Sequence, residues 1–173
     1  MSGLADHYYI REITEEELPL ALDFRQRMFS EMGVSDEVLI SDSKQILQEM
    51  YSREFGAGRL RHYVAYPTDS LVPVAICGAL IKDDFPYFLF RPGSYGWIVD
   101  VYTVPEHRGK GLAKVLLTHT HDWLISKGIL EAKLIASGKE ARRLYERSGY
   151  AATWEMTLSL TGGATFNSII DER

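Results

Sequence analysis

The chain has 173 residues, of which 46% are hydrophobic, and its formal net charge is −5. This length supports one domain with a substantial core, and we expect a single domain over residues 1–173 in which residues 161–173 form a tail. The acidic balance leaves no basic surplus with which to neutralise a phosphate backbone, so a nucleic-acid partner is not expected.

Cys77 is the single cysteine, which excludes an internal disulfide and a cysteine-rich metal site. A lone cysteine fits a reducing compartment, so we expect a cytoplasmic protein. His119 and His121 lie two apart on an expected helix and do not face each other, so we expect no metal site. The longest nearly unbroken apolar stretch runs from Leu71 to Ile81 and is well short of the roughly 20 residues that a membrane helix needs. A membrane partner is therefore not expected either.

The first half of the chain predicts, in order, a strand, two helices and a hairpin of two strands. The expected ranges are residues 8–14, 15–29, 41–55, 62–66 and 72–81. Thr14 and Glu17 have the spacing of a capping box, which marks the start of the first helix. Pro19 would remove a hydrogen bond beyond the first turn, so this helix is expected to start late or to kink. A Pro-Thr-Asp-Ser turn separates the two strands of the hairpin.

The second half predicts strands and helices in alternation. The expected ranges are a strand over residues 97–104, a helix over 112–127, a strand over 132–136, a helix over 140–148 and a strand over 154–160. Pro105 ends the first of these strands, and Gly128 caps the longest helix. The last strand is predicted by the alternation of Trp154, Met156, Leu158 and Leu160. The order βααβββαβαβ predicts an α/β fold built on a mixed sheet.

A glycine-rich turn, R-G-K-G-L-A over residues 108–113, joins the strand at 97–104 to the longest helix. Glycines at the start of a helix aim free backbone N–H groups at one point and let a phosphate approach closely, and the helix dipole adds to the attraction. A plain tight turn is the alternative. Two other phosphate motifs fail on spacing, because a P-loop needs Ser or Thr after Gly109-Lys110 and a dinucleotide fingerprint needs Gly or Ala in place of Lys114.

The chain resembles the GNAT superfamily of acyl-CoA N-acetyltransferases in this region. The central motif of that family reads Arg or Gln, two residues, Gly, one residue, and Gly or Ala, and Arg108, Gly111 and Ala113 match it. A-R-R-L-Y-E-R-S-G-Y over residues 141–150 is similar to the second signature of the family. The resemblance is strong over residues 95–160 and implies a mixed, mostly antiparallel central sheet flanked by helices.

The resemblance also implies how acetyl-CoA is held. Pantetheine pairs with the backbone of the strand before the motif, and the diphosphate lies on the N–H groups of the glycine turn. The residues assigned to cofactor binding in this way are Tyr102, Thr103, Val104, Arg108, Gly109, Lys110, Gly111, Leu112, Ala113, Ser137 and Gly138. Gly138 stands where many relatives carry a cofactor-contacting Asn, and Ser137 is the expected partial substitute.

Acetyl transfer from a thioester to an amine needs a neutral amine, a stabilised oxyanion and a proton for the departing thiolate. The resemblance implies Tyr145 as the general acid, although a tyrosine at helical spacing also fits a core anchor. Val99 stands where some relatives carry a catalytic Glu. Asp100 is the nearest acid and is the candidate base through water; the alternatives are a structural, hydrogen-bonded carboxylate and an amine that binds already neutral.

We therefore expect an N-acetyltransferase that moves an acetyl group from acetyl-CoA directly to an amine of a small molecule or peptide in a ternary complex. The alternative is a CoA-binding sensor or scaffold without activity, which Val99 leaves open. In relatives the acceptor enters between the early helices and the late strands, which here implicates residues 18–55 and the connection at 83–95. The acceptors that fit this expectation are a small molecule, a peptide N-terminus and a protein lysine, and a homodimer is an alternative to a monomer.

Overall fold

The structure is a computed structural model that describes residues 4–34, 42–86 and 93–160. Its helices are α1 (Leu18–Glu31), α2 (Ser43–Gly56), α3 (Leu112–Ser126) and α4 (Lys139–Arg147), and its strands are β1 (Tyr8–Glu12), β2 (Leu60–Pro67), β3 (Ala75–Asp83), β4 (Ser94–Thr103) and β5 (Ala132–Lys133). None of the helices formed by these residues is both long enough and apolar enough to cross a membrane.

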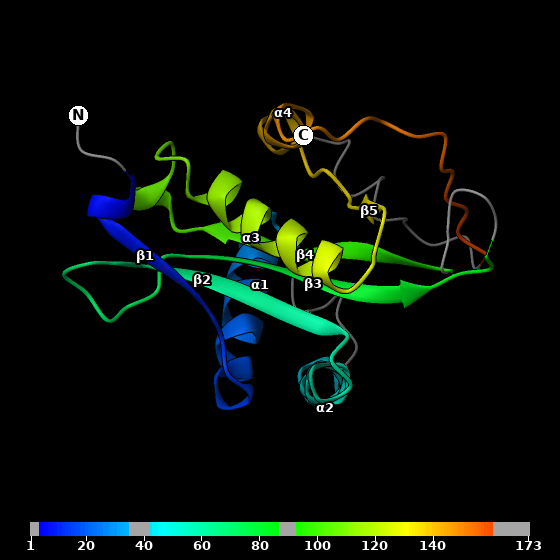
Figure 1. The fold of residues 1–173 in the computed structure, drawn as a ribbon, viewed down its shortest axis with the longest axis horizontal. Coiled ribbons are helices and arrows are strands. Elements are labelled where there is room, and N and C mark those ends of the chain that lie inside the picture. Colours follow the sequence, from blue (N-terminus) through cyan, green and yellow to red (C-terminus); the bar gives the residue numbers. More distant parts are fainter. Residues whose placement is uncertain (1–3, 35–41, 87–92, 161–173) are drawn as a thin grey trace.

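The strands form one sheet in the order β1-β2-β3-β4-β5. The first three pairs are antiparallel, and β5 lies parallel to β4 after the crossover through α3. Helices α1 and α2 cover one face of the sheet, and α3 and α4 lie on the other (Figure 1). The predicted fold class, a mixed and mostly antiparallel sheet flanked by helices, is confirmed.

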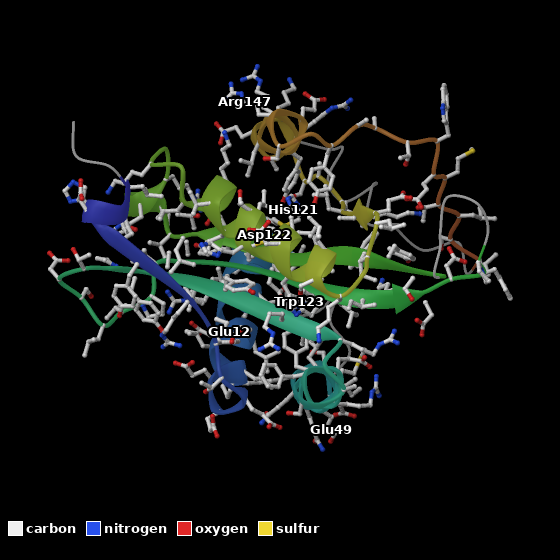
Figure 2. The ribbon with its side chains drawn as sticks, viewed as in Figure 1. Glu12, Glu49, His121, Asp122, Trp123 and Arg147 are labelled. Carbon is white, nitrogen blue, oxygen red and sulfur yellow. The ribbon has the colours of Figure 1, made fainter. Side chains whose placement is uncertain are left out.

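Two hydrophobic clusters follow from the alternation of side chains along the strands. Val64 of β2 packs on the side of α1 and α2, and its neighbour Ala65 packs on the side of α3; both are fully buried. Phe24 anchors α1 to the first cluster, and Leu116 anchors α3 to the second. Charged side chains such as Glu49 of α2 and Arg147 of α4 point away from the sheet (Figure 2). The helices are therefore amphipathic layers over a shared sheet.

The start of α1 agrees with the expectation of a late helix. A single 3-10 turn spans Glu15–Glu17, and α1 begins at Leu18 with Pro19 in its first turn, where a missing N–H breaks no intrahelical bond. The backbone N–H of Thr14 donates to Glu17 Oε2 at 2.9 Å, which is the reciprocal half of the predicted capping box.

The strand predicted over residues 154–160 is wrong. Residues 151–159 form neither helix nor strand, and the alternating side chains are exposed, with Trp154 98% and Met156 96% accessible. An alternating pattern becomes a strand only where another strand accepts its hydrogen bonds, and β5 pairs with β4 over two residues only. One ion pair, Lys133 Nζ to Glu155 Oε1 at 2.8 Å, connects this segment to β5.

Two other strands are shorter than or displaced from their predicted ranges. Strand β3 starts at Ala75 instead of Val72, and Leu71 and Val72 are exposed, so they belong to the turn. Strand β5 keeps two of its five expected residues. The predicted connection at residues 83–95 lies partly outside the described residues, because 87–92 are not among them.

Candidate active site

A β-bulge interrupts β4 one residue after Val99. Ile76 pairs with Tyr102 and Gly78 pairs with Val99, so a single residue of β3, Cys77, lies opposite two residues of β4. The first of these two, Asp100, has a φ of 56° and is the one non-glycine residue with positive φ in the described part of the chain. A bulge bends the strand and re-aims its side chains, and a non-glycine residue at positive φ carries strain that the surroundings must offset.

Asp100 is held by three donors from three other elements. Arg25 Nη1 of α1 donates to Oδ1 at 2.7 Å, while Tyr51 of α2 and His62 Nε2 of β2 both donate to Oδ2, at 2.5 Å and 2.8 Å. The side chains of Asp100 and His62 are fully buried. Burial alone would raise the pKa of Asp100, but the hydrogen bond from His62 and the nearby positive charge of Arg25 outweigh it and lower the pKa.

This arrangement bears on the predicted role of Asp100 as a base through water. A carboxylate with no exposed surface, three donors and a lowered pKa is a poor proton acceptor at neutral pH. The geometry favours the alternative reading, in which Asp100 is a structural, hydrogen-bonded carboxylate.

The glycine turn lies at the N-terminus of α3. Gly109 and Gly111 have φ values of 73° and 85°, and a Cβ added at either position would meet no protein atom within 4 Å. The first turn of a helix leaves its N–H groups without intrahelical partners, and Leu112, 1% exposed, fixes that turn against the sheet. Donors in open space at the positive end of a helix fit a phosphate group.

The side chain of Arg108 reaches toward α1. Its guanidinium forms a two-point ion pair with Glu31, with N–O distances of 2.6 Å and 2.7 Å, and its Nε donates to the carbonyl of Thr103 at 2.9 Å. The hydroxyl of Tyr102 donates to the same carboxylate at 3.0 Å. The end of α1 is thus joined to both ends of the segment that links β4 to the glycine turn.

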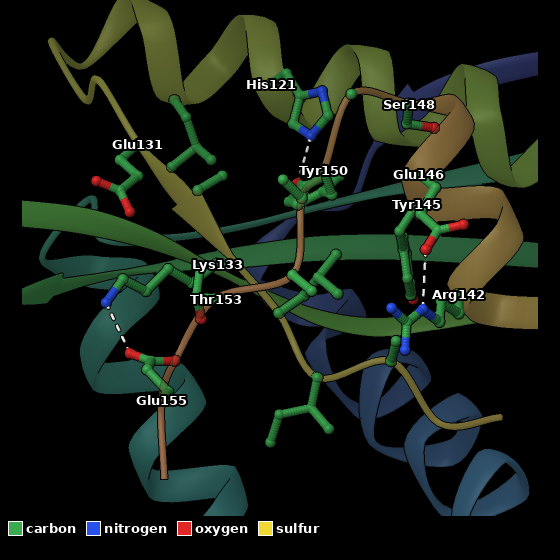
Figure 3. Close-up of a pocket in the computed structure, with 18 of the residues that line it drawn as sticks. His121, Glu131, Lys133, Arg142, Tyr145, Glu146, Ser148, Tyr150, Thr153 and Glu155 are labelled. Atoms are coloured by element: carbon green, nitrogen blue, oxygen red, sulfur yellow. Dashed lines mark hydrogen bonds and ion pairs between the residues drawn. The ribbon is translucent and has the colours of Figure 1, made fainter. Parts of the chain in front are cut away.

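An open groove of about 1470 Å³ lies between α3, β5, α4 and the segment after α4 (Figure 3). Tyr145 of α4 lines it with 8% of its surface exposed, and Gly138 is also among its lining residues. The ring of Tyr145 packs edge-on against Tyr150, whose hydroxyl lies 2.7 Å from Nε2 of His121. Burial, and to a lesser extent the nearby Cys77, raise the pKa of Tyr145 well above the usual value for a phenol, so this hydroxyl stays protonated.

The predicted site residues fall on two faces of the sheet. The glycine turn and Tyr145 belong to the side of α3 and α4, whereas the carboxylate of Asp100 faces α1 and α2. Cys77, opposite the bulge, packs in the same cluster as Tyr145. The bulge therefore lies between the two groups of residues.

The sequence analysis did not identify the partners of Asp100. They are Arg25, Tyr51 and His62. These residues share no motif or spacing, and only the topology brings them together. Among the residues that the structure describes, no group of three or more His, Cys, Asp or Glu side chains is placed to hold a metal ion.

The chain matches the model of the Acetyltransferase (GNAT) family over residues 24–150, and it belongs to that family. No protein of curated function matches it. Among solved structures it is similar to a predicted acetyltransferase with acetyl-CoA from Clostridium acetobutylicum, at 21% identity, a TM-score of 0.80 and coverage of 91% of this chain and 99% of the other. A GCN5-related N-acetyltransferase from Ralstonia eutropha JMP134 shows 23% identity, a TM-score of 0.79 and coverage of 90% and 99%.

An aminoglycoside N-acetyltransferase in complex with CoA is more distant, at 17% identity and a TM-score of 0.67, with coverage of 88% and 93%. At these identities the similarity establishes the fold.

Proposed function

We propose that the protein is an acetyl-CoA-dependent N-acetyltransferase that moves an acetyl group directly to an amine of a small molecule or a peptide. One observation carries the proposal: the open N–H groups at the start of α3 and the protonated hydroxyl of Tyr145 lie on the same side of the sheet, next to a bulged strand. The first fits a diphosphate and the second supplies the proton that a departing thiolate needs.

Acetyl-CoA binds, in this proposal, along the end of β4 and the glycine turn. Backbone groups of Tyr102 and Thr103 pair with pantetheine, and the N–H groups of residues 109–113 take the diphosphate. Val104, the third residue expected to pair, already uses its N–H and its carbonyl in bonds to Val74 and His107. The free space where a Cβ would stand at Gly109 and Gly111 supports this placement. Arg108 acts mainly through Glu31 and the Thr103 carbonyl, and so holds the strand end in place.

Tyr145 is the general acid. Because its pKa is raised by burial, the phenol remains a hydrogen-bond donor over the whole neutral range and can stabilise negative charge as it forms on the leaving sulfur. The proposed reaction has no covalent acyl-enzyme intermediate. Cys77 is the single cysteine of the chain, and burial raises the pKa of its thiol to about 12, which makes it unsuited to act as a nucleophile. This supports direct transfer within a ternary complex.

The acceptor amine approaches from the side of α1 and α2. A hollow of about 670 Å³ adjoins Tyr102 on this side, and the carboxylates of Asp23 and Glu31 line it together with Arg27. Both carboxylates are paired, Asp23 with Arg27 and Glu31 with Arg108, so the hollow is polar but close to neutral and does not select the acceptor by charge. Small-molecule acceptors gain support from the distant relatives with the same fold, an aminoglycoside N-acetyltransferase and a glucosamine-6-phosphate N-acetyltransferase. With Asp100 saturated by donors, the amine is proposed to lose its proton to water or to enter in its neutral form.

The test is an acetyl-CoA-dependent mass-shift screen of a metabolite and peptide mixture, followed by measurement of CoA release with each compound that gains an acetyl group. We expect at least one amine to be acetylated, with one CoA released per acetyl transferred. Tight binding of acetyl-CoA without acetylation of any amine would instead identify a CoA-binding sensor or scaffold. Absence of acetyl-CoA binding would contradict both functions.

A further inference from the structure

Four polar side chains from four elements meet at the bulge of β4. They are Arg25 of α1, Tyr51 of α2, His62 of β2 and Asp100 of β4, here called the Asp100 cluster. Arg25 is the member with the most exposed side chain, at 26%, and the side chains of His62 and Asp100 are fully buried. The cluster thus ties both helices of one layer to a single residue of the sheet.

The cluster is a costly way to fill a core. Transferring a carboxylate from water to a protein interior costs several kcal/mol, and apolar residues of similar volume are often as stable as a buried ion pair. Here the cost is offset by three donors to one carboxylate, and the Tyr51 hydroxyl stays a donor because burial raises its pKa. Such a group is best explained by a need for defined geometry, and the geometry at this position is unusual.

That geometry is the bulge. Asp100 has a φ of 56°, in the region that non-glycine residues rarely occupy, and its side-chain hydrogen bonds hold it there. Val101, Tyr102 and Thr103 follow directly, and they complete β4 before the glycine turn. Because the bulge sets the direction of these three residues, anything that fixes Asp100 also fixes the backbone donors and acceptors that come after it.

We propose that the Asp100 cluster is a positioning device: it holds the bulge of β4 so that the backbone of residues 101–103 is set to receive the pantetheine arm of acetyl-CoA. This inference rests on the proposed function. Asp100 acts through the strand and touches no reacting atom. This positioning role takes the place of the catalytic-base role that the sequence predicts for Asp100.

The test separates the pantetheine arm from the rest of the cofactor. Affinities are measured by calorimetry for acetyl-CoA and for 3′-phospho-ADP, which carries the nucleotide and diphosphate of CoA without pantetheine. Asp100→Asn keeps the size of the side chain and tolerates positive φ but removes the charge. Tyr51→Phe removes one donor and keeps the ring. Tyr66→Phe is the matched control, because Tyr66 is also buried in the α1 and α2 layer but its hydroxyl bonds Arg11, outside the cluster.

We expect Asp100→Asn and Tyr51→Phe to weaken acetyl-CoA binding by roughly three- to tenfold, the loss typical of one neutral hydrogen bond between pantetheine and the displaced strand, while 3′-phospho-ADP binds as in the wild type. Tyr66→Phe should change neither affinity. Equal losses for both ligands would mean that the cluster only stabilises the fold, and unchanged acetyl-CoA affinity would mean that it does not position the strand; either result overturns the inference. If Asp100→Asn fails to fold, Tyr51→Phe decides.

The inference and the proposed function fail in different ways. If the wild-type protein binds acetyl-CoA no more tightly than 3′-phospho-ADP, the pantetheine arm contributes nothing to the affinity. The cluster then has no positioning role. A wild-type protein that shows this contribution and acetylates no amine contradicts the proposed reaction and leaves the positioning role in place.

Discussion

Gly78 of β3 lies against the ring of His62, so closely that a Cβ added at Gly78 would stand 2.3 Å from Cδ2 of that ring. The ring is fully buried and donates to Asp100, so it has no free direction in which to move. A glycine at residue 78 is therefore a requirement of the Asp100 cluster.

Gly78→Ala should lower the free energy of unfolding by about 1–3 kcal/mol, the usual cost of overpacking a core. For a chain of this size each kcal/mol corresponds to a decrease in Tm of roughly 2–4 °C. The measurement is thermal unfolding followed by circular dichroism. Gly56→Ala is the control, because a Cβ at Gly56 meets no atom within 4 Å. Equal Tm values for the two variants would mean that His62 is not fixed as described.

Gly111→Ala should weaken CoA binding about ten- to hundredfold, because the added methyl group occupies the space through which a phosphate approaches the start of α3. The substitution also places a side chain at positive φ, which by itself costs stability. Gly128→Ala isolates that cost: Gly128 follows the other end of α3 with a φ of 76° and equally open surroundings.

The two variants should therefore lose similar stability, and only Gly111→Ala should lose affinity in calorimetric titrations with CoA. Comparable CoA affinities in the two variants would contradict the placement of the diphosphate at this turn.

Features that depend on neighbouring residues in the chain were predictable from the sequence. The periodic helix at 112–126 and the glycine turn before it are examples, because their signals lie within a short window. The strand predicted at 154–160 was wrong for the opposite reason. Its alternating side chains fulfil the local condition for a strand, but strand formation also needs a partner, and that depends on the tertiary structure.

The candidate site also contains both kinds of feature, one set by neighbouring residues in the chain and one set by the tertiary structure. Tyr145 could be assigned through a local motif, whereas the environment of Asp100 is built by residues 25, 51 and 62 from three distant elements. The sequence carried one indirect signal, a glycine next to the buried Cys77 inside a strand, since such glycines mark close approach of another group. Without the fold, that signal does not identify His62 as the group that approaches.

Glu17→Gln should lower the stability at neutral pH by about 0.3–1 kcal/mol, the range for an exposed ion pair. The hydrogen bond from Arg11 is the main reason that the pKa of Glu17 falls from 4.5 to about 2; burial opposes this shift, and the Thr14 N–H adds to it. Because the pKa is lower in the folded state, the stabilisation is complete above pH 4.5 and is lost as the pH falls toward 2.

Thermal unfolding at a series of pH values checks this. The difference in Tm between the wild type and Glu17→Gln should be largest near pH 7 and should vanish toward pH 2. Glu15→Gln, in the same 3-10 turn, removes an equal charge and controls for the net charge. A Tm difference that stays constant with pH would show that the ionised carboxylate of Glu17 contributes nothing.

Tyr145→Phe should reduce kcat by roughly a hundredfold or more, the effect of losing a general acid, and should leave the KM for acetyl-CoA nearly unchanged. The ring and its contact with Tyr150 are kept, so packing is preserved. Because burial raises the pKa of Tyr145 above 10, the wild-type rate should show no decrease from loss of this proton as the pH rises to 10. Steady-state kinetics with an acceptor found in the mass-shift screen provides the measurement.

Tyr63→Phe is the matched control, because Tyr63 packs on the same side of the sheet, where its ring stacks on His119 and does not line the groove. Tyr63→Phe also removes a hydroxyl, and its kcat should stay within a few-fold of the wild type. If Tyr145→Phe keeps full kcat across the pH range while the chemical step limits the rate, Tyr145 is a packing residue and the thiolate takes its proton from water. A lower Tm in Tyr145→Phe is corrected for by assaying both variants well below their unfolding transitions, so that a loss of rate reports on chemistry.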